Sequence, residues 1–138
     1  MKPLLLDTHI WLWFALANRD RLKPAAIQAI QEAARRGYLR VSIITIWEIG
    51  LLESKGRVHL GLALDDWIER ALALPGLSLA PLNAKMALDC NRLPGEFHAD
   101  PADRIIVATA RRLDATLMTA DRKIIEYGKS GYVSILEP

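Results

Sequence analysis

The sequence contains little cysteine, no long apolar run and almost no net charge, and each shortage excludes a class of protein. Its one cysteine, Cys90, cannot form an internal disulfide, which argues against a disulfide-stabilised secreted fold. The longest apolar stretch, residues 10–17, is far shorter than the roughly 20 residues of a membrane span. Asp7 interrupts the only apolar segment near the start, which does not fit a signal peptide. We therefore expect a cytoplasmic protein with no membrane segment.

Several ligand-binding motifs are also missing. The net charge of +2 at pH 7 is too small for a protein that binds nucleic acid by charge alone. No pair of histidines lies four residues apart, no Cys-x-x-Cys motif is present to bind zinc, and there is no glycine-rich phosphate loop of the Walker type. Aspartate and glutamate, which together number 16, remain as the candidates for catalysis and metal binding.

The order of the predicted elements indicates an α/β fold. The chain has 138 residues, of which 51% are hydrophobic, so we expect a single domain spanning residues 1–138. The predicted strands are residues 4–6, 38–42, 116–119 and 132–136. The predicted helices are residues 10–16, 24–37, 43–54, 65–74, 83–92, 100–114 and 121–128. Residues 77–79 are left unassigned. Strands that alternate with helices are typical of βαβ units around a parallel sheet.

Three aspartates lie where such a sheet binds its ligands. Asp7 directly follows the first predicted strand, Asp121 comes shortly after the strand at residues 116–119, and Asp103 lies in the first turn of a helix. Ligands of open parallel sheets bind beyond the carboxyl ends of the strands, so these side chains could converge there. Aspartate is also a good helix N-cap, and capping alone would explain any one of them.

The pair Asp100 and Asp103 separates the two interpretations. Asp100 precedes Pro101 and therefore already fills the N-cap position of its helix. Asp103 shares a helical face with Ile106 and Val107, at spacings of three and four residues. We therefore expect Asp103 to face inward, which capping does not require.

Glu48 has the strongest physical argument of any acid in the chain. Its helix, residues 43–54, is apolar almost all round, which predicts a buried helix. The neighbours three and four residues away offer no basic side chain to Glu48. A buried carboxylate without a partner normally protonates, pairs or binds a metal. The alternative is that Glu48 lies at the rim in contact with water, or meets an arginine from elsewhere.

Together these acids predict a pocket lined by oxygen atoms, which would suit a hard divalent cation. Mg²⁺ fits best, and Mn²⁺ is possible. We therefore expect the catalytic residues and the metal ligands to be the same four acids: Asp7, Glu48, Asp103 and Asp121.

Four segments of the chain resemble the motifs of one protein family. They run from Leu4 to His9, from Ser42 to Ile49, from His98 to Arg104, and from Thr119 to Asp121. In this order they are similar to the motifs of the PIN-domain nucleases, and within them to the VapC-like toxins of bacterial toxin–antitoxin pairs. One such motif would be weak, but four in order along the whole chain are specific.

This resemblance implies an α/β/α sandwich with a central, mostly parallel sheet, and endonucleolytic cleavage of RNA with Mg²⁺ or Mn²⁺. It places the four acids in the metal pocket, and gives Thr8 and Thr119 the task of orienting carboxylates or water. Asp100 would be structural. The family further implies a homodimer and a cognate antitoxin protein whose tail blocks the pocket.

Other side chains near the motifs receive weaker roles. Arg104 or Arg122 is a candidate for holding the RNA backbone. His9 and His98 adjoin the motifs, but we interpret both as structural hydrogen-bonding residues and leave them outside the catalytic set.

Two other functions stay open at this point. The first is a PIN-like module without catalytic activity, whose pocket only binds RNA or a protein partner. The second is a phospho-receiver domain, which also places aspartates at strand ends. A receiver would need an acidic pair early in the chain and a lysine after a late strand, whereas Asp7 stands alone.

Overall fold

The computed structural model describes residues 2–138 and is built on a five-stranded sheet. The strands are β1 Leu4–Leu6, β2 Leu39–Ser42, β3 Leu77–Ala80, β4 Thr116–Met118 and β5 Ser134–Leu136. The helices are α1 Thr8–Ala15, the 3₁₀ turn η1 Arg19–Arg21, α2 Pro24–Arg35, α3 Ile43–Ser54, α4 Leu64–Leu72, α5 Ala84–Asp89, α6 Pro101–Arg112 and α7 Arg122–Lys129.

The order of the strands creates a switch point at the centre of the sheet. All neighbouring strands are parallel, in the order β3-β2-β1-β4-β5. In β1, Leu4 pairs with Leu39 on one side and with Thr116 on the other. The chain winds outward from β1 to β3 and then returns to β4 on the opposite side of β1. Doubly wound sheets bind ligands at this reversal, beyond the carboxyl ends of the strands.

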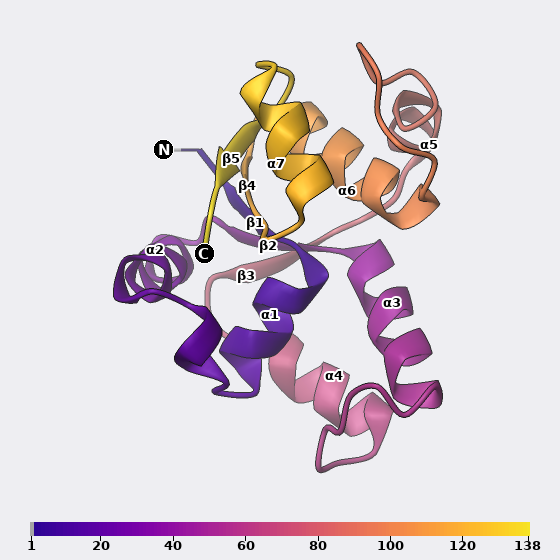
Figure 1. Cartoon of the computed structure of the whole chain (residues 1–138). Helices are drawn as coiled ribbons and strands as arrows, with labels where there is room; N and C mark the ends of the chain where they lie inside the picture. Colours follow the sequence, from indigo (N-terminus) through magenta and orange to yellow (C-terminus); the bar gives the residue numbers. More distant parts are fainter. Residues whose placement is uncertain (1) are drawn as a thin grey trace.

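Helices cover both faces of the sheet, as the expected α/β/α sandwich requires. In β1, Leu4 and Leu6 pack into one apolar core with α1, α2 and α4, whereas Leu5 packs into the other with α6 and α7. This alternation follows from the two-residue period of a strand, and it explains why β1 is apolar throughout. In Figure 1, α5, α6 and α7 lie on one side of the sheet, and α1, α2 and α4 on the other.

Most helix boundaries match their sequence signals. The bounds of α3 are those predicted, and Ser42 caps the helix by accepting a hydrogen bond from the Ile44 amide at 3.2 Å. Asp100 caps α6 as expected, with Pro101 at its first position. Residues 77–79, for which the sequence predicted no element, belong to the strand β3 Leu77–Ala80.

A close backbone contact fixes the start of β3. Gly76 has a φ of +86°, and a Cβ atom there would lie 1.6 Å from the carbonyl oxygen of Ala34 in α2. Only glycine fits both the positive φ and the contact. The Gly76 carbonyl also accepts a hydrogen bond from the Leu39 amide at 3.3 Å, which brings the beginnings of β2 and β3 together.

The expectation that α3 is buried all round is wrong. Its inner side contributes Thr45 and Ile49 to the interior, but Ile43, Trp47 and Leu51 are exposed, and Trp47 keeps 60% of its surface accessible. The exposed residues recur every four positions and form one stripe. The apolar residues on all sides of α3 therefore do not mean that α3 is fully buried. One apolar face of this helix is not covered by the rest of the chain.

Helices long and apolar enough to cross a membrane are not found in residues 2–138.

Candidate active site at the switch point

All four predicted acids line one cavity of about 350 Å³. It lies at the reversal of the strand order, where the chain leaves β1 and β4. The cavity wall also includes Thr8, His9 and Asp100. Residues far apart in the sequence therefore meet at the edge of the sheet where the fold binds ligands.

Asp7 links the end of β1 to the start of α1. One carboxylate oxygen, Oδ1, accepts the Thr8 amide at 2.8 Å, and the other, Oδ2, accepts the Thr119 hydroxyl at 2.6 Å. Burial raises the pKa of Asp7, although both hydrogen bonds lower it. The capping interpretation is thus correct for Asp7, and the residue lies in the cavity as well.

Glu48 reaches the cavity from the middle of α3. Its Oε1 accepts the Thr8 hydroxyl at 2.6 Å, and that hydroxyl also lies 3.0 Å from the Thr45 hydroxyl. Within residues 2–138, no lysine or arginine forms an ion pair with Glu48. Burial is the largest cause that raises the pKa of Glu48, and the Asp7 carboxylate adds to it. Glu48 is half-buried, which places it between the two interpretations left open by the sequence.

Asp103 has a strongly raised pKa. It lies in the first turn of α6, where Asp100 makes the cap bond to the Ala102 amide at 3.0 Å. Burial raises the pKa of Asp103 to about 7, and repulsion by Asp7, Asp100, Asp121 and Glu48 contributes. The inward position predicted for Asp103 is confirmed.

Asp121 caps α7 and still faces the cavity. Its Oδ1 accepts the amides of Lys123 and Ile124 at 2.9 and 3.1 Å. The Asp121 amide donates to the Thr119 hydroxyl at 3.0 Å, and the same hydroxyl donates to Asp7. Thr119 therefore connects the ends of β1 and β4, and it orients a carboxylate as the resemblance implied.

Sequence reasoning expected a structural hydrogen bond for His98 but not its contact with Asp103. Its Nε2 lies 3.1 Å from Asp103 Oδ2, is buried, and makes no hydrogen bond among the described residues. The Asp100 amide lies 3.4 Å from His98 Nδ1 and orients the ring. His98 is the first residue of the third motif, but its contact with Asp103 depends on the path of the preceding loop.

These side chains fit a divalent cation. Within residues 2–138, one set of three possible ligand atoms lies within 4.8 Å of one another, and it comes from His98, Asp103 and Asp121. Asp7 and Glu48 line the same cavity but do not belong to this set. Carboxylate oxygens suit Mg²⁺ or Mn²⁺, and the unpartnered imidazole nitrogen adds a ligand that Mn²⁺ accepts more readily than Mg²⁺ does.

The structure separates the two arginines considered for RNA binding. Arg104 donates hydrogen bonds to the carbonyl oxygens of Cys90, Phe97 and His98, at 2.8, 2.9 and 3.1 Å. These bonds tie down the loop that carries His98, so Arg104 has a structural role there. Arg122 is exposed at the start of α7.

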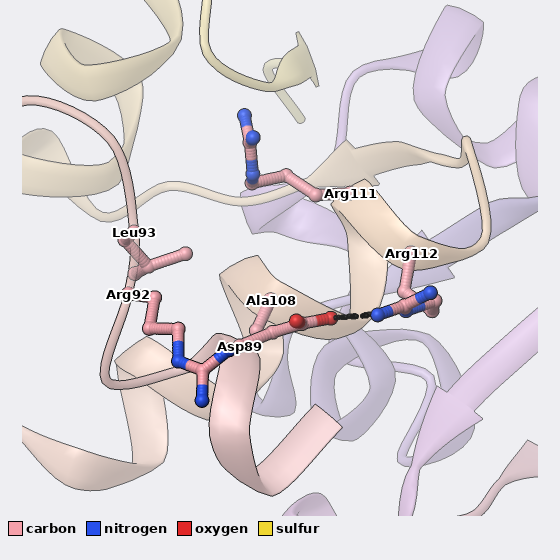
Figure 2. A pocket seen from close by; sticks show the side chains of 6 residues that line it. All are labelled: Asp89, Arg92, Leu93, Ala108, Arg111 and Arg112. Carbon is pink, nitrogen blue, oxygen red and sulfur yellow. Dashed lines mark hydrogen bonds and ion pairs between the residues drawn. The ribbon is translucent and has the colours of Figure 1, made fainter. Parts of the chain in front are cut away.

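A second cavity, of about 280 Å³, lies where α5 meets α6. Figure 2 shows Arg92 and Arg112 on either side of Asp89, whereas the Arg111 guanidinium points away from them. Arg112 forms an ion pair with Asp89 at 2.8 Å. None of the four acids lines this cavity, so it is not the predicted site.

Comparisons with known proteins agree with this architecture. A family model described as PIN domain matches residues 4–130. Ribonuclease VapC22 from Mycobacterium tuberculosis is 34% identical to this chain over 125 residues, which are 90% of this chain and 91% of the relative.

Solved structures share the fold at lower identity. VapBC2 from Rickettsia felis, bound to a DNA fragment from its promoter, is 16% identical with a TM-score of 0.70, and 97% of each chain is covered. DNA-bound VapBC from Salmonella typhimurium is 15% identical with a TM-score of 0.67, covering 99% of this chain and 98% of the other.

Proposed function

The chain belongs to the PIN-domain family, and on that basis we propose that it is a Mg²⁺- or Mn²⁺-dependent endoribonuclease, the toxin of a toxin–antitoxin pair. The observation that carries this proposal is the meeting of four acids in one cavity at the switch point, where burial and repulsion between the acids raise the pKa of Asp103 to about 7. A divalent cation would relieve this repulsion. The similarity to Ribonuclease VapC22 supports RNA as the substrate.

We propose that Asp7, Glu48, Asp103 and Asp121 are the catalytic residues and hold the metal. Asp103 and Asp121 are closest to a shared position, together with His98. When bound, the cation supplies Lewis acidity, which activates water and stabilises negative charge on the scissile phosphate.

The protein's hydroxyl groups prepare the carboxylates for this task. Thr8 donates to Glu48, and Thr119 donates to Asp7, both at 2.6 Å. These bonds hold the acceptor oxygens in place and favour the ionised forms, which are the forms that bind a cation. Outside the cavity, Arg122 is available to hold the RNA backbone.

The alternative function is a catalytically silent module that uses the cavity only to bind RNA or a protein. The presence of all four acids favours the enzyme, since a binding surface has no need for a carboxylate whose pKa is raised to about 7.

Exposed apolar surface supports a homodimer. Ile43, Trp47 and Leu51 form a stripe on α3, and Leu88 on α5 keeps 51% of its surface accessible. Both helices pack against α6. Exposed apolar surface of this kind marks protein–protein contacts. We propose that a second copy of the chain covers it.

The similar solved structures include VapBC complexes, which supports a cognate antitoxin as a further partner. An enzyme that acts on cellular RNA works where that RNA is found, so we place this protein in the cytoplasm.

RNA cleavage by the native chain and by Glu48→Gln, with and without Mg²⁺, tests the proposal. Glutamine keeps the size of Glu48 but removes its charge. Changes to residues that merely surround a metal site cost about 10–100-fold, so loss of a ligand should reduce the rate at least about 100-fold. Glu53→Gln, an exposed change on the same helix, is the matched control and should cleave normally. Equal cleavage by the native chain and Glu48→Gln would contradict the assignment.

A further inference from the structure

A cavity of about 460 Å³, larger than the cavity lined by the four acids, lies beside it and is lined by aromatic and basic side chains. It lies between α7 and the loop that precedes α6. His98 lines this α7 cavity and lies 3.1 Å from Asp103, while Arg122 lines it and directly follows Asp121. The α7 cavity is therefore the space that a strand bound at the carboxylates would enter next. Its volume falls within the range of about 300–1,000 Å³ typical of small-ligand sites.

One wall of the α7 cavity is aromatic and firmly held. The ring of Phe97 lies 4.9 Å from the ring of Tyr127 and 4.4 Å from that of His98, measured between centroids. Tyr127 is buried and donates its hydroxyl to the Pro94 carbonyl at 2.5 Å. Arg104 holds the carbonyl of Phe97 from behind. Phe97 itself is only partly buried, and it lines the cavity.

The α7 side of the cavity also carries positive charge. Arg122 and Lys123 are exposed, and within residues 2–138 neither forms an ion pair. The acid on this side, Glu126, is paired with Lys129 at 3.0 Å. Glu96 lies at the edge of the aromatic loop. Two cationic side chains thus remain free beside an aromatic ring.

We propose that the α7 cavity binds the nucleotide next to the scissile phosphate, with its base stacked on Phe97 and its phosphate held by Arg122 and Lys123. This inference rests on the proposed ribonuclease function. Unpaired bases stack on aromatic side chains, and cationic side chains bind the phosphates between them. A duplex keeps its bases stacked inside, so this subsite selects single-stranded RNA.

A purely structural role for Phe97 makes a different prediction. In that case the ring only fastens the loop to Tyr127, and replacing it would change stability but leave RNA affinity unaltered. Phe97→Leu distinguishes the two roles, because leucine keeps apolar contact with Tyr127 but has no aromatic face. Phe97→Trp enlarges that face.

The experiment measures binding of a short, labelled, mixed-sequence single-stranded RNA to the full chain in EDTA by fluorescence anisotropy. Phe97→Leu should weaken binding about 10-fold, whereas Phe97→Trp should bind at least as tightly as the native chain. Phe14→Leu changes the chain's other phenylalanine, which lines none of the cavities, and should have no effect.

Charge is tested separately. Lys123→Ala should weaken RNA binding and lower the slope of log K against log salt concentration by about one. Lys23→Ala, which changes the exposed N-cap residue of α2, is the control and should change neither quantity. Both lysines are exposed, so these variants should fold even if Phe97→Leu does not. The matching RNA duplex should bind more weakly than the single strand and be insensitive to Phe97→Leu.

Failure of this subsite differs from failure of the nuclease function. If the native chain cleaves RNA with Mg²⁺ but folded Phe97→Leu binds it unchanged, the subsite is wrong and the nuclease stands. If binding depends on Phe97 but no cleavage occurs, the subsite stands and the nuclease is wrong. Salt-dependent binding that falls with Lys123→Ala but ignores both Phe97 variants would overturn the stacking proposal.

Discussion

Asp103→Asn should stabilise the metal-free protein. Burial and four neighbouring acids raise the pKa of Asp103 from 3.8 to about 7. Folding therefore opposes ionisation of this carboxylate. Asparagine has nearly the same shape and no charge, so the substitution removes the repulsion and changes little else.

The sign of the pH dependence follows from the raised pKa. Between about pH 4 and pH 7 the folded state holds a proton on Asp103 that the unfolded state has lost. The free energy of unfolding of the native chain should therefore fall as pH rises through this window, and stay level above it. Asp103→Asn should lack this contribution, and its advantage should be largest above pH 7.

The magnitude follows from the same pKa. At about 1.4 kcal/mol per pH unit, the full change corresponds to about 4 kcal/mol. The Asp103 side chain is 15% exposed, and solvent in the open cavity screens the charges, so we expect about 2 kcal/mol. For a chain of 138 residues this corresponds to about 6–8 °C in melting temperature.

Thermal unfolding in EDTA at pH 8, followed by circular dichroism, measures this effect. Asp66→Asn is the matched control, because Asp66 lies in the first turn of α4, as Asp103 does in α6, but is exposed. Asp66→Asn should leave the melting temperature unchanged or lower it slightly. Mg²⁺ should raise the melting temperature of the native chain and not that of Asp103→Asn. A native chain that melts at or above the temperature of Asp103→Asn in EDTA would refute the repulsion argument.

Two further predictions concern residues outside the carboxylates. Arg104→Gln removes the cationic donor from three backbone carbonyls, so urea unfolding should show a loss of about 2–3 kcal/mol, whereas the exposed Arg92→Gln should show almost none. Equal midpoints would mean that the loop before α6 does not need Arg104. Trp47→Glu places a charge in the exposed α3 stripe and should convert a dimer into a folded monomer, measured by size-exclusion chromatography with light scattering. An unchanged mass would show that the dimer uses another surface.

Local signals were enough to predict much of the fold. Pro24 and Pro101 mark helix starts, Asp100 is a cap, and the apolar run of β1 indicated a buried strand. These signals act within a few residues, so they survive without knowledge of the tertiary structure. β3 stayed unassigned because its start depends on the fit of a glycine against α2, which is a long-range contact.

The four acids lie in one cavity, as expected, but the reason given for Glu48 is wrong in part. Glu48 lines the cavity, but its helix is not buried all round, as its apolar sequence suggested. Periodicity counts apolar residues on a helix and cannot tell a face that packs inside from one left for a partner. The contacts of His98 with Asp103 and of Arg104 with the loop carbonyls were not predicted, for a related reason. Their contacts depend on the loop at residues 90–98, whose path no local rule describes.

From the sequence, capping and metal binding are alternative roles for the aspartates. In the structure, one aspartate can cap a helix and also line the cavity. Asp121 uses Oδ1 to accept both amides at the start of α7, which leaves Oδ2 without a protein donor among the described residues. Asp7 caps α1 through Oδ1 and holds Thr119 through Oδ2, yet lies in the same cavity. A helix begins within four residues of the end of β1 and of β4, so the residue that caps the helix also lies beside the cavity. The same geometry therefore makes these aspartates structural and places their charge where a cation would bind. Asp103 caps nothing, and burial together with repulsion by the neighbouring acids raises its pKa, as expected of a cavity suited to a cation.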